Sequence, residues 1–153
     1  MVFVMNIFVS TYTNKIDAKK RISVPASYRA IIENESPNSN ILVVYRSIIN
    51  NCYEGCSLDR LQKIGEKINQ LEPLSEEREY LSYVYLSSSL QIAIDNEGRV
   101  VFPKNILQDL KLSDNAIFSG KGEVFEIWNP QEFEEYAAKS RQKALENRAK
   151  LRF

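Results

Sequence analysis

"KIDAKKRISVP" at residues 15–25 and "AIDNEGRVVFP" at residues 93–103 carry one pattern, written twice in the chain. Each stretch reads Ile-Asp, three variable residues, Arg, an apolar residue, two further residues and Pro. The Asp, Arg and Pro positions of the two stretches are each separated by 78 residues. Self-similarity at a single offset indicates an internal repeat, so we expect two copies of one structural unit.

Both copies have the same order of predicted elements: strand, turn, strand, helix opened by proline, strand. Pro25 and Pro103 open the helices, because proline is suited to the first helical position. "NNCYEGC" at 50–56 has no clear period and allows no assignment. Alternating or apolar runs predict the strands, at 7–12, 21–24, 41–47, 90–94, 99–102, 115–119 and 124–128.

Two further helices are predicted between the copies, and one more follows the second copy. Ser57 and Ser75 suit the caps of the first two, since a serine oxygen accepts hydrogen bonds from the free amides of a first turn. Pro73 is expected to end the first of them, and Asn129 with Pro130 begins the last. The first linker helix has an apolar stripe at helical spacing: Leu58, Leu61, Ile64, Ile68 and Leu71.

A unit of about 45 residues buries too little apolar surface to be stable alone. We therefore expect the two copies to pack together with interlocking strands, in an α+β fold that is mainly β. The predicted division of the chain is a first repeat at 7–54, a helical linker at 55–86, a second repeat at 87–129 and a C-terminal helix and tail at 130–153.

The composition limits the classes of function. Lys and Arg total 20, as do Asp and Glu, so a nucleic-acid site has to be a local cluster of charge. No apolar run approaches the roughly 20 residues that span a bilayer. "MVFVMNIFV" at 1–9 lacks the basic start and small-residue cleavage site of a signal peptide, and Met5 could equally be the start.

The chain has no histidine, which excludes Ser-His-Asp and Cys-His nucleophilic catalysis. Cys52 and Cys56 are the only cysteines, too few for a zinc site, and two free thiols in a reducing cytosol are expected. No glycine loop suited to phosphates and no constellation of paired carboxylates is present. We therefore expect no enzyme, metal, cofactor or small-molecule substrate.

The segment from Asp95 to Gly98 has the residue choice of a type I turn, with Asp first and Gly fourth. Arg99 follows at the tip of a tight hairpin. Lys20 stands in the first copy where Gly98 stands in the second. If the two turns share a shape, Lys20 adopts a positive φ at a cost of about 1 kcal/mol. An exposed turn without function is the alternative interpretation, since duplication copies structural residues too.

Local charge favours nucleic acid as the partner. Arginine has a rigid fork of donors for phosphate or for guanine, and neighbouring lysines add point charges for the DNA backbone. The second copy is weaker, because Arg99 and Lys104 are balanced by Asp95 and Glu97. The first copy has five cations against Asp17 alone: Lys15, Lys19, Lys20, Arg21 and Arg29.

"IDAKKRISVPASYR", "IDNEGRVVFP", "GEVFEIW" and "LSEEREYLSYVYLSSS" together resemble the MraZ family, bacterial regulators with tandem SpoVT-AbrB domains. The resemblance covers about 6–136. It implies a swapped-hairpin β-barrel built from two tandem intrachain repeats, ring-like homo-oligomers, and binding to short double-stranded DNA repeats at the promoter of the division and cell-wall gene cluster. The chain departs from the family pattern at Lys20, usually Gly, and at Leu107, usually Arg.

By this resemblance Arg21 and Arg99 face the DNA, and five residues shape the loops: Asp17, Asp95, Gly98, Pro25 and Pro103. The predicted function is a sequence-specific DNA-binding transcriptional regulator, cytoplasmic and nucleoid-associated. An AbrB-like antitoxin that regulates its own promoter is an alternative, although such chains usually carry one copy and a disordered tail. An oligomeric scaffold without DNA binding is another.

Overall fold

The computed structural model describes residues 6–152. Its main element is a six-stranded antiparallel sheet in the order β1-β7-β8-β4-β3-β5, and β2 pairs with β6 in a second, two-stranded sheet. The strands are β1 Thr11–Lys15, β2 Arg21–Ser23, β3 Ile41–Arg46, β4 Tyr53–Cys56, β5 Leu90–Ala93, β6 Arg99–Val101, β7 Asn115–Gly120 and β8 Phe125–Trp128. The helices are α1 Ala26–Glu35, α2 Leu58–Asn69, α3 Glu76–Ser82, α4 Lys104–Asp109 and α5 Pro130–Asn147, with a π-helical turn η1 Tyr83–Ser87 and a 3-10 turn η2 Arg148–Leu151.

The strands of the two copies interlock as predicted. β1 pairs with β7, β3 with β5, β4 with β8 and β2 with β6, so each of these pairings joins the first copy to the second. The mixed α+β class is confirmed. The hydrogen bonds of the described residues define an open sheet with β1 and β5 at its edges, and the closed barrel that the resemblance implies is not formed by them.

The two halves are related by a near-twofold axis. In the small sheet Ile22 lies opposite Val100, while Arg21 pairs with Val101 and Ser23 with Arg99. These pairs exchange with one another when each residue is replaced by its counterpart 78 positions away. Each strand of this sheet buries its central residue, and Ile22 and Val100 are both about 1% exposed. The flanking arginines therefore lie on the opposite, outer face of the small sheet.

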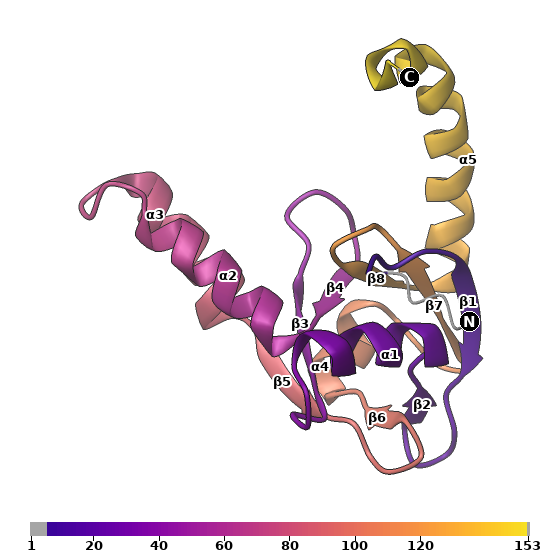
Figure 1. The fold of residues 1–153 in the computed structure, drawn as a ribbon. Helices are drawn as coiled ribbons and strands as arrows, with labels where there is room; N and C mark the ends of the chain where they lie inside the picture. Colours follow the sequence, from indigo (N-terminus) through magenta and orange to yellow (C-terminus); the bar gives the residue numbers. More distant parts are fainter. Residues whose placement is uncertain (1–5, 153) are drawn as a thin grey trace, which may run out of the picture.

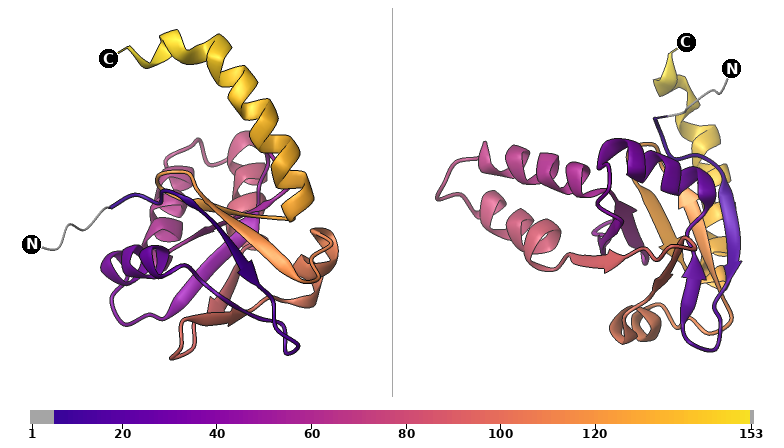
Figure 2. Two further views of the ribbon diagram at one scale, coloured as in Figure 1. Left: turned by 90° about the vertical axis from the view of Figure 1, so that its right-hand side faces the viewer. Right: turned by 60° about the horizontal axis from the view of Figure 1, so that its bottom comes forward.

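The main core lies between the large sheet and the helices α1 and α4 (Figure 1). The rest of the sheet is covered in two separate patches, one by α2 and η1 and the other by the start of α5. Beyond these contacts α2 and α3 form a helical hairpin that projects from the body, and α5 projects elsewhere (Figures 1 and 2). None of the helices described between residues 6 and 152 is long and apolar enough to cross a membrane.

The predicted caps are confirmed. The Ser57 and Ser75 hydroxyls accept hydrogen bonds from the amides of Arg60 and Arg78, and the Asn129 side chain accepts from two amides of α5. Two boundaries differ from the prediction. Helix α2 ends at Asn69, before the expected stop at Pro73. The first strand begins at Thr11 rather than residue 7, because Ser10 has a positive φ of 71° that interrupts the extended chain.

Strand β4 occupies the stretch that had no assignment. Cys52, Tyr53, Gly55 and Cys56 are all buried, so both sides of the strand are covered and the sequence shows no polar alternation. Both thiols are free, and burial raises the pKa of Cys56 to about 12. Burial raises the pKa of Cys52 as well. Thiols held protonated in this way are poor nucleophiles and poor metal ligands.

Candidate nucleic-acid interface

The first loop runs from Asp17 to Arg21 between β1 and β2, and its aspartate organises it. One carboxylate oxygen of Asp17 accepts hydrogen bonds from the amides of Lys19 and Arg21, at 2.9 and 2.8 Å. The other accepts the Nε–H of Arg21 at 2.7 Å. The backbone closes the turn, since the Lys20 amide donates to the Asp17 carbonyl at 3.0 Å. The Arg21 side chain is thus fixed in orientation by Asp17 of the same loop.

The second loop, from Asp95 to Arg99 between β5 and β6, repeats this arrangement. Asp95 accepts from the amides of Glu97 and Arg99 at 2.8 and 2.9 Å, and from the Arg99 Nε–H at 3.2 Å. The Gly98 amide donates to the Asp95 carbonyl at 3.0 Å. The repeated sequence pattern therefore corresponds to a repeated structure, with the aspartate fixing the arginine in each copy.

Both aspartates are held in their charged form. The hydrogen bond from the Arg21 amide is the largest cause that lowers the pKa of Asp17, and the amide of Arg99 does the same for Asp95. The guanidinium groups add to both effects. The ion pair uses the Nε–H of each arginine. Among the described residues the terminal nitrogens of Arg21 make no further hydrogen bond, so their donors remain available.

The two loops differ in charge. Lys20 has φ 65° and Gly98 has φ 80°, which confirms that the two turns share a shape and that Lys20 adopts the left-handed conformation. A terminal nitrogen of Arg99 lies 3.3 Å from the carboxylate of Glu97. The equivalent position in the first loop is Lys19, a cation. The first loop is therefore open and basic, whereas the second is partly neutralised by its own acid.

The remaining predicted cations lie outside the two loops. Lys15 is exposed on β1, and Lys104 is exposed at the start of α4. Pro25 and Pro103 stand at the N-caps of α1 and α4, so each helix begins one residue later than predicted, when proline was taken as its first residue. Arg29 does not join the first loop, since its guanidinium packs against Gly98 of the second.

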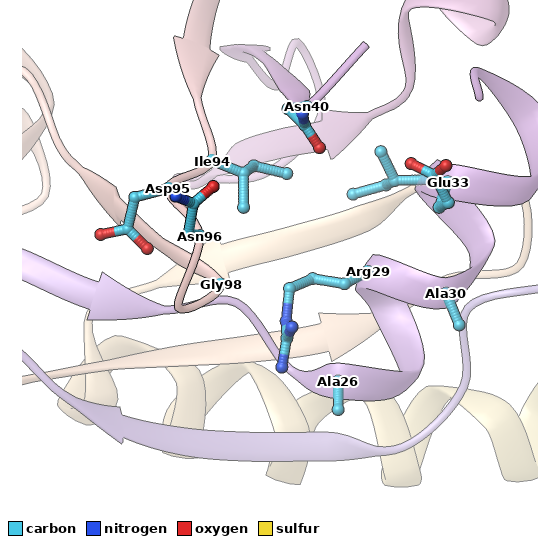
Figure 3. Close-up of a pocket in the computed structure, with 10 residues that line it drawn as sticks. Ala26, Arg29, Ala30, Glu33, Asn40, Ile94, Asp95, Asn96 and Gly98 are labelled. Carbon is cyan, nitrogen blue, oxygen red and sulfur yellow. The ribbon is translucent and has the colours of Figure 1, made fainter. Parts of the chain in front are cut away.

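A pocket of about 470 Å³ opens between α1 and the second loop (Figure 3). Arg29 extends from α1 toward Gly98, with Glu33 further along the same helix. Asn40 and Ile94 border the other side. Sequence reasoning missed this site, because no local signal shows that a helix of the first copy reaches a loop of the second. The described residues contain no group of three or more Cys, Asp or Glu that could hold a metal ion.

Known proteins resemble this chain over nearly its full length. Residues 86–153 match the family described as "MraZ protein, putative antitoxin-like". The chain is 41% identical over 148 residues to the transcriptional regulator MraZ of Rickettsia canadensis, covering 97% of this chain and 98% of the relative. It is 42% identical over 149 residues to that of Rickettsia bellii (strain OSU 85-389), with the same coverage. Identity of this extent, together with the doubled Asp-to-Arg loop, establishes that the chain belongs to the MraZ family.

Proposed function

We propose that this protein is a transcriptional regulator that binds double-stranded DNA through its two Asp-to-Arg loops. Arg21 and Arg99 are the residues proposed to read base edges, and the exposed Lys15, Lys19, Lys20 and Lys104 contact phosphates. The observation that carries the proposal is the placement of both arginines on the outer face of the β2–β6 sheet, each fixed by its own aspartate. The relatives' name, transcriptional regulator, supports it.

The chemistry of the loops suits DNA. A guanidinium held by its Nε–H still has a fork of donors, and guanine presents two acceptors to such a fork in the major groove. Orientation by a carboxylate lowers the entropy lost when the side chain binds. The lysines add phosphate contacts that position the protein without reading sequence. A single chain thus presents two similar Asp-to-Arg loops related by a near-twofold axis.

The finer parts of the proposal follow from the family resemblance. The target is the promoter of the division and cell-wall gene cluster, and the protein is cytoplasmic and associated with the nucleoid. The chain divides at 7–54, 55–86, 87–129 and 130–153. The fold is of the swapped-hairpin barrel type, which is supported by the pairing of strands across the copies and by the small sheet lying beside β1 and β5.

The protein is also proposed to form a ring-like homo-oligomer. One chain has two Asp-to-Arg loops. Several weak contacts on repeated DNA give tight binding overall when their geometry lets them form at the same time. Light scattering at micromolar concentration measures the mass directly. A mass above that of a dimer is expected, and a monomer would contradict this part of the proposal.

The test of DNA binding is a footprint on the DNA upstream of the protein's own gene. Protection of short repeats is expected, with loss of protection when Arg21 and Arg99 are both replaced by alanine. A scrambled fragment of equal length is the control for non-specific binding. Purified protein that protects no sequence, with an intact circular dichroism spectrum, would favour the scaffold. A family description that contains the word antitoxin favours one further candidate, an antitoxin, for which a toxin that copurifies would be the sign.

A further inference from the structure

Arg29 lies on the first turn of α1, in the first copy, yet its side chain belongs spatially to the second loop. Its Nε–H donates to the Val24 carbonyl at 3.0 Å, and its guanidinium lies beside Gly98. The Val24 amide in turn donates to the Gly98 carbonyl at 3.0 Å. The second loop is therefore attached to the opposite copy through its backbone.

The guanidinium fills the space in front of Gly98. A Cβ atom at this position would lie 2.4 Å from Cζ of Arg29 and 2.6 Å from its Nε. Gly98 is buried and has a φ of 80°. No side chain can therefore stand at position 98 while Arg29 keeps its place. The arginine and the glycine form one coupled contact across the boundary between the copies.

At the position related by the near-twofold axis, different residues take the places of this glycine and this arginine. The counterpart of Gly98 is Lys20, which is exposed and has φ 65°, and the counterpart of Arg29 is Leu107, half-buried against the core. One loop has glycine with arginine on the helix, and the other has lysine with leucine on the helix. The chain thus contains both combinations in the same backbone setting, and each fits.

We propose that Arg29 is a positioning residue for the second DNA-reading loop, acting on Arg99 across the boundary between the copies. The guanidinium supports the loop backbone at Gly98, one residue before Arg99, and its own hydrogen bond to Val24 keeps it there. This role replaces the phosphate contact expected of Arg29 from its place in the sequence. The inference about DNA reading rests on the proposed function, whereas the coupling between residues 29 and 98 does not.

The physical reason for such support is the low charge of the second loop. Arg99 contacts two carboxylates in one arrangement, Asp95 through Nε at 3.2 Å and Glu97 through a terminal nitrogen at 3.3 Å, so its placement depends on the loop backbone that carries all three residues. A rigid backbone at Gly98 restricts the backbone position from which the Arg99 side chain extends. In the first loop Arg21 has one carboxylate partner, at 2.7 Å, and Lys19 in place of Glu97. There a helix arginine is not needed for orientation.

The test is a double-mutant cycle that gives the second loop the residue pair of the first, with lysine at position 98 and leucine at position 29. Arg29→Leu, Gly98→Lys and the double variant are compared with wild type by thermal unfolding and by DNA titration. Lys67→Leu, on α2 far from both loops, is the control for loss of one positive charge. Each single variant is expected to lower the melting temperature, Gly98→Lys because its side chain expels Arg29. The double variant is expected to melt at or above Gly98→Lys, because the expelled residue is gone.

DNA readouts separate positioning from a phosphate contact. Arg29→Leu is expected to weaken binding of the footprinted fragment about tenfold and of a scrambled fragment much less, with an unchanged slope of log K against log salt. A slope reduced by about 0.9 per bound chain would assign Arg29 to a phosphate and overturn the positioning role. Arg29→Lys, which keeps the charge without the planar fork, is expected to resemble Arg29→Leu.

The two failures are distinguishable. Additive changes in melting temperature across the cycle would show that residues 29 and 98 act independently, and would overturn the inference whatever the DNA result. A wild-type protein that binds no specific DNA, with a non-additive thermal cycle, would refute the proposed function and the positioning role while leaving the cross-copy contact established.

Discussion

The loop at 17–21 and the loop at 95–99 have matching backbone hydrogen bonds and different surroundings. Both turn on an aspartate that accepts two amides and one arginine Nε–H. Only the second has a glycine at the left-handed position, covered by a helix side chain from the other copy. The comparison teaches that the local sequence pattern sets the shape of each turn, whereas the opposite copy sets which side chain packs against the turn backbone.

The largest loss of DNA affinity is expected when the arginine of either loop is removed. Arg21→Ala and Arg99→Ala are each expected to cost about 1–3 kcal/mol of specific DNA binding, because each deletes one pair of base contacts. Fluorescence anisotropy on the footprinted fragment measures the loss, with circular dichroism as the check on folding. Equal affinities for both variants and wild type would mean that neither loop reads DNA.

Gly98→Ala tests the part of the comparison that concerns the glycine. It is expected to lower the free energy of unfolding by about 1–2 kcal/mol, since alanine is strained at positive φ and its Cβ collides with Arg29. Lys20→Ala is the matched control in the other loop, and because a residue with a Cβ is already present there, its effect should stay within about 0.5 kcal/mol. Urea denaturation of the two variants provides the measurement, and equal losses would contradict the difference between the loops.

Lys20→Gly makes the two loops alike at their left-handed position. Relief of strain is expected to exceed the extra entropy of the unfolded glycine, so stability should hold or rise by up to about 1 kcal/mol. Affinity for DNA should fall, and the salt slope should shrink by about 0.9 per bound chain for each phosphate that the variant no longer binds. A salt titration on one fragment decides this, since an identical slope would show that Lys20 touches no phosphate.

The smallest effect concerns the aspartates. The pKa of Asp17 and that of Asp95 are both lowered from 3.8, so their contribution to stability is present above that value and is lost as the pH falls below it. Asp95→Asn is therefore expected to melt slightly below wild type at about pH 6, and the gap should close toward about pH 3. Asp17→Asn should behave alike. A gap that persists at low pH would mean that the carboxylate charge does not hold the loop.

Much of the fold was predictable because the repeat is visible in the sequence. The 78-residue offset predicted two interlocked units, and the mismatch of Lys20 with Gly98 predicted a lysine at positive φ, which the structure confirms. Capping by Ser57 and Asn129 was readable from side-chain chemistry alone. These features are local or depend on comparing one copy with the other.

What sequence reasoning missed depends on contacts between the copies. Strand β4 lacked a period because both its sides are covered, and Gly55 is needed there since a Cβ would lie 2.4 Å from the ring of Phe125. Arg29 was counted with the cations of the first copy because charge was summed along the chain. Its neighbour in space is Gly98, which stands 69 positions away in the sequence.

The interlocking of the strands has a consequence for how the protein is made. β1 finds its partner in β7, β4 in β8 and β2 in β6, so the first copy leaves the ribosome without the strands that complete it. At roughly 5–20 residues per second, the 72 positions from Cys56 to Trp128 take about 4 to 14 seconds to translate. During that interval the nascent chain exposes unpaired strand edges, which are sites of aggregation. Folding of this protein is thus a late, post-translational event dominated by distant pairings, and a slow one for its size.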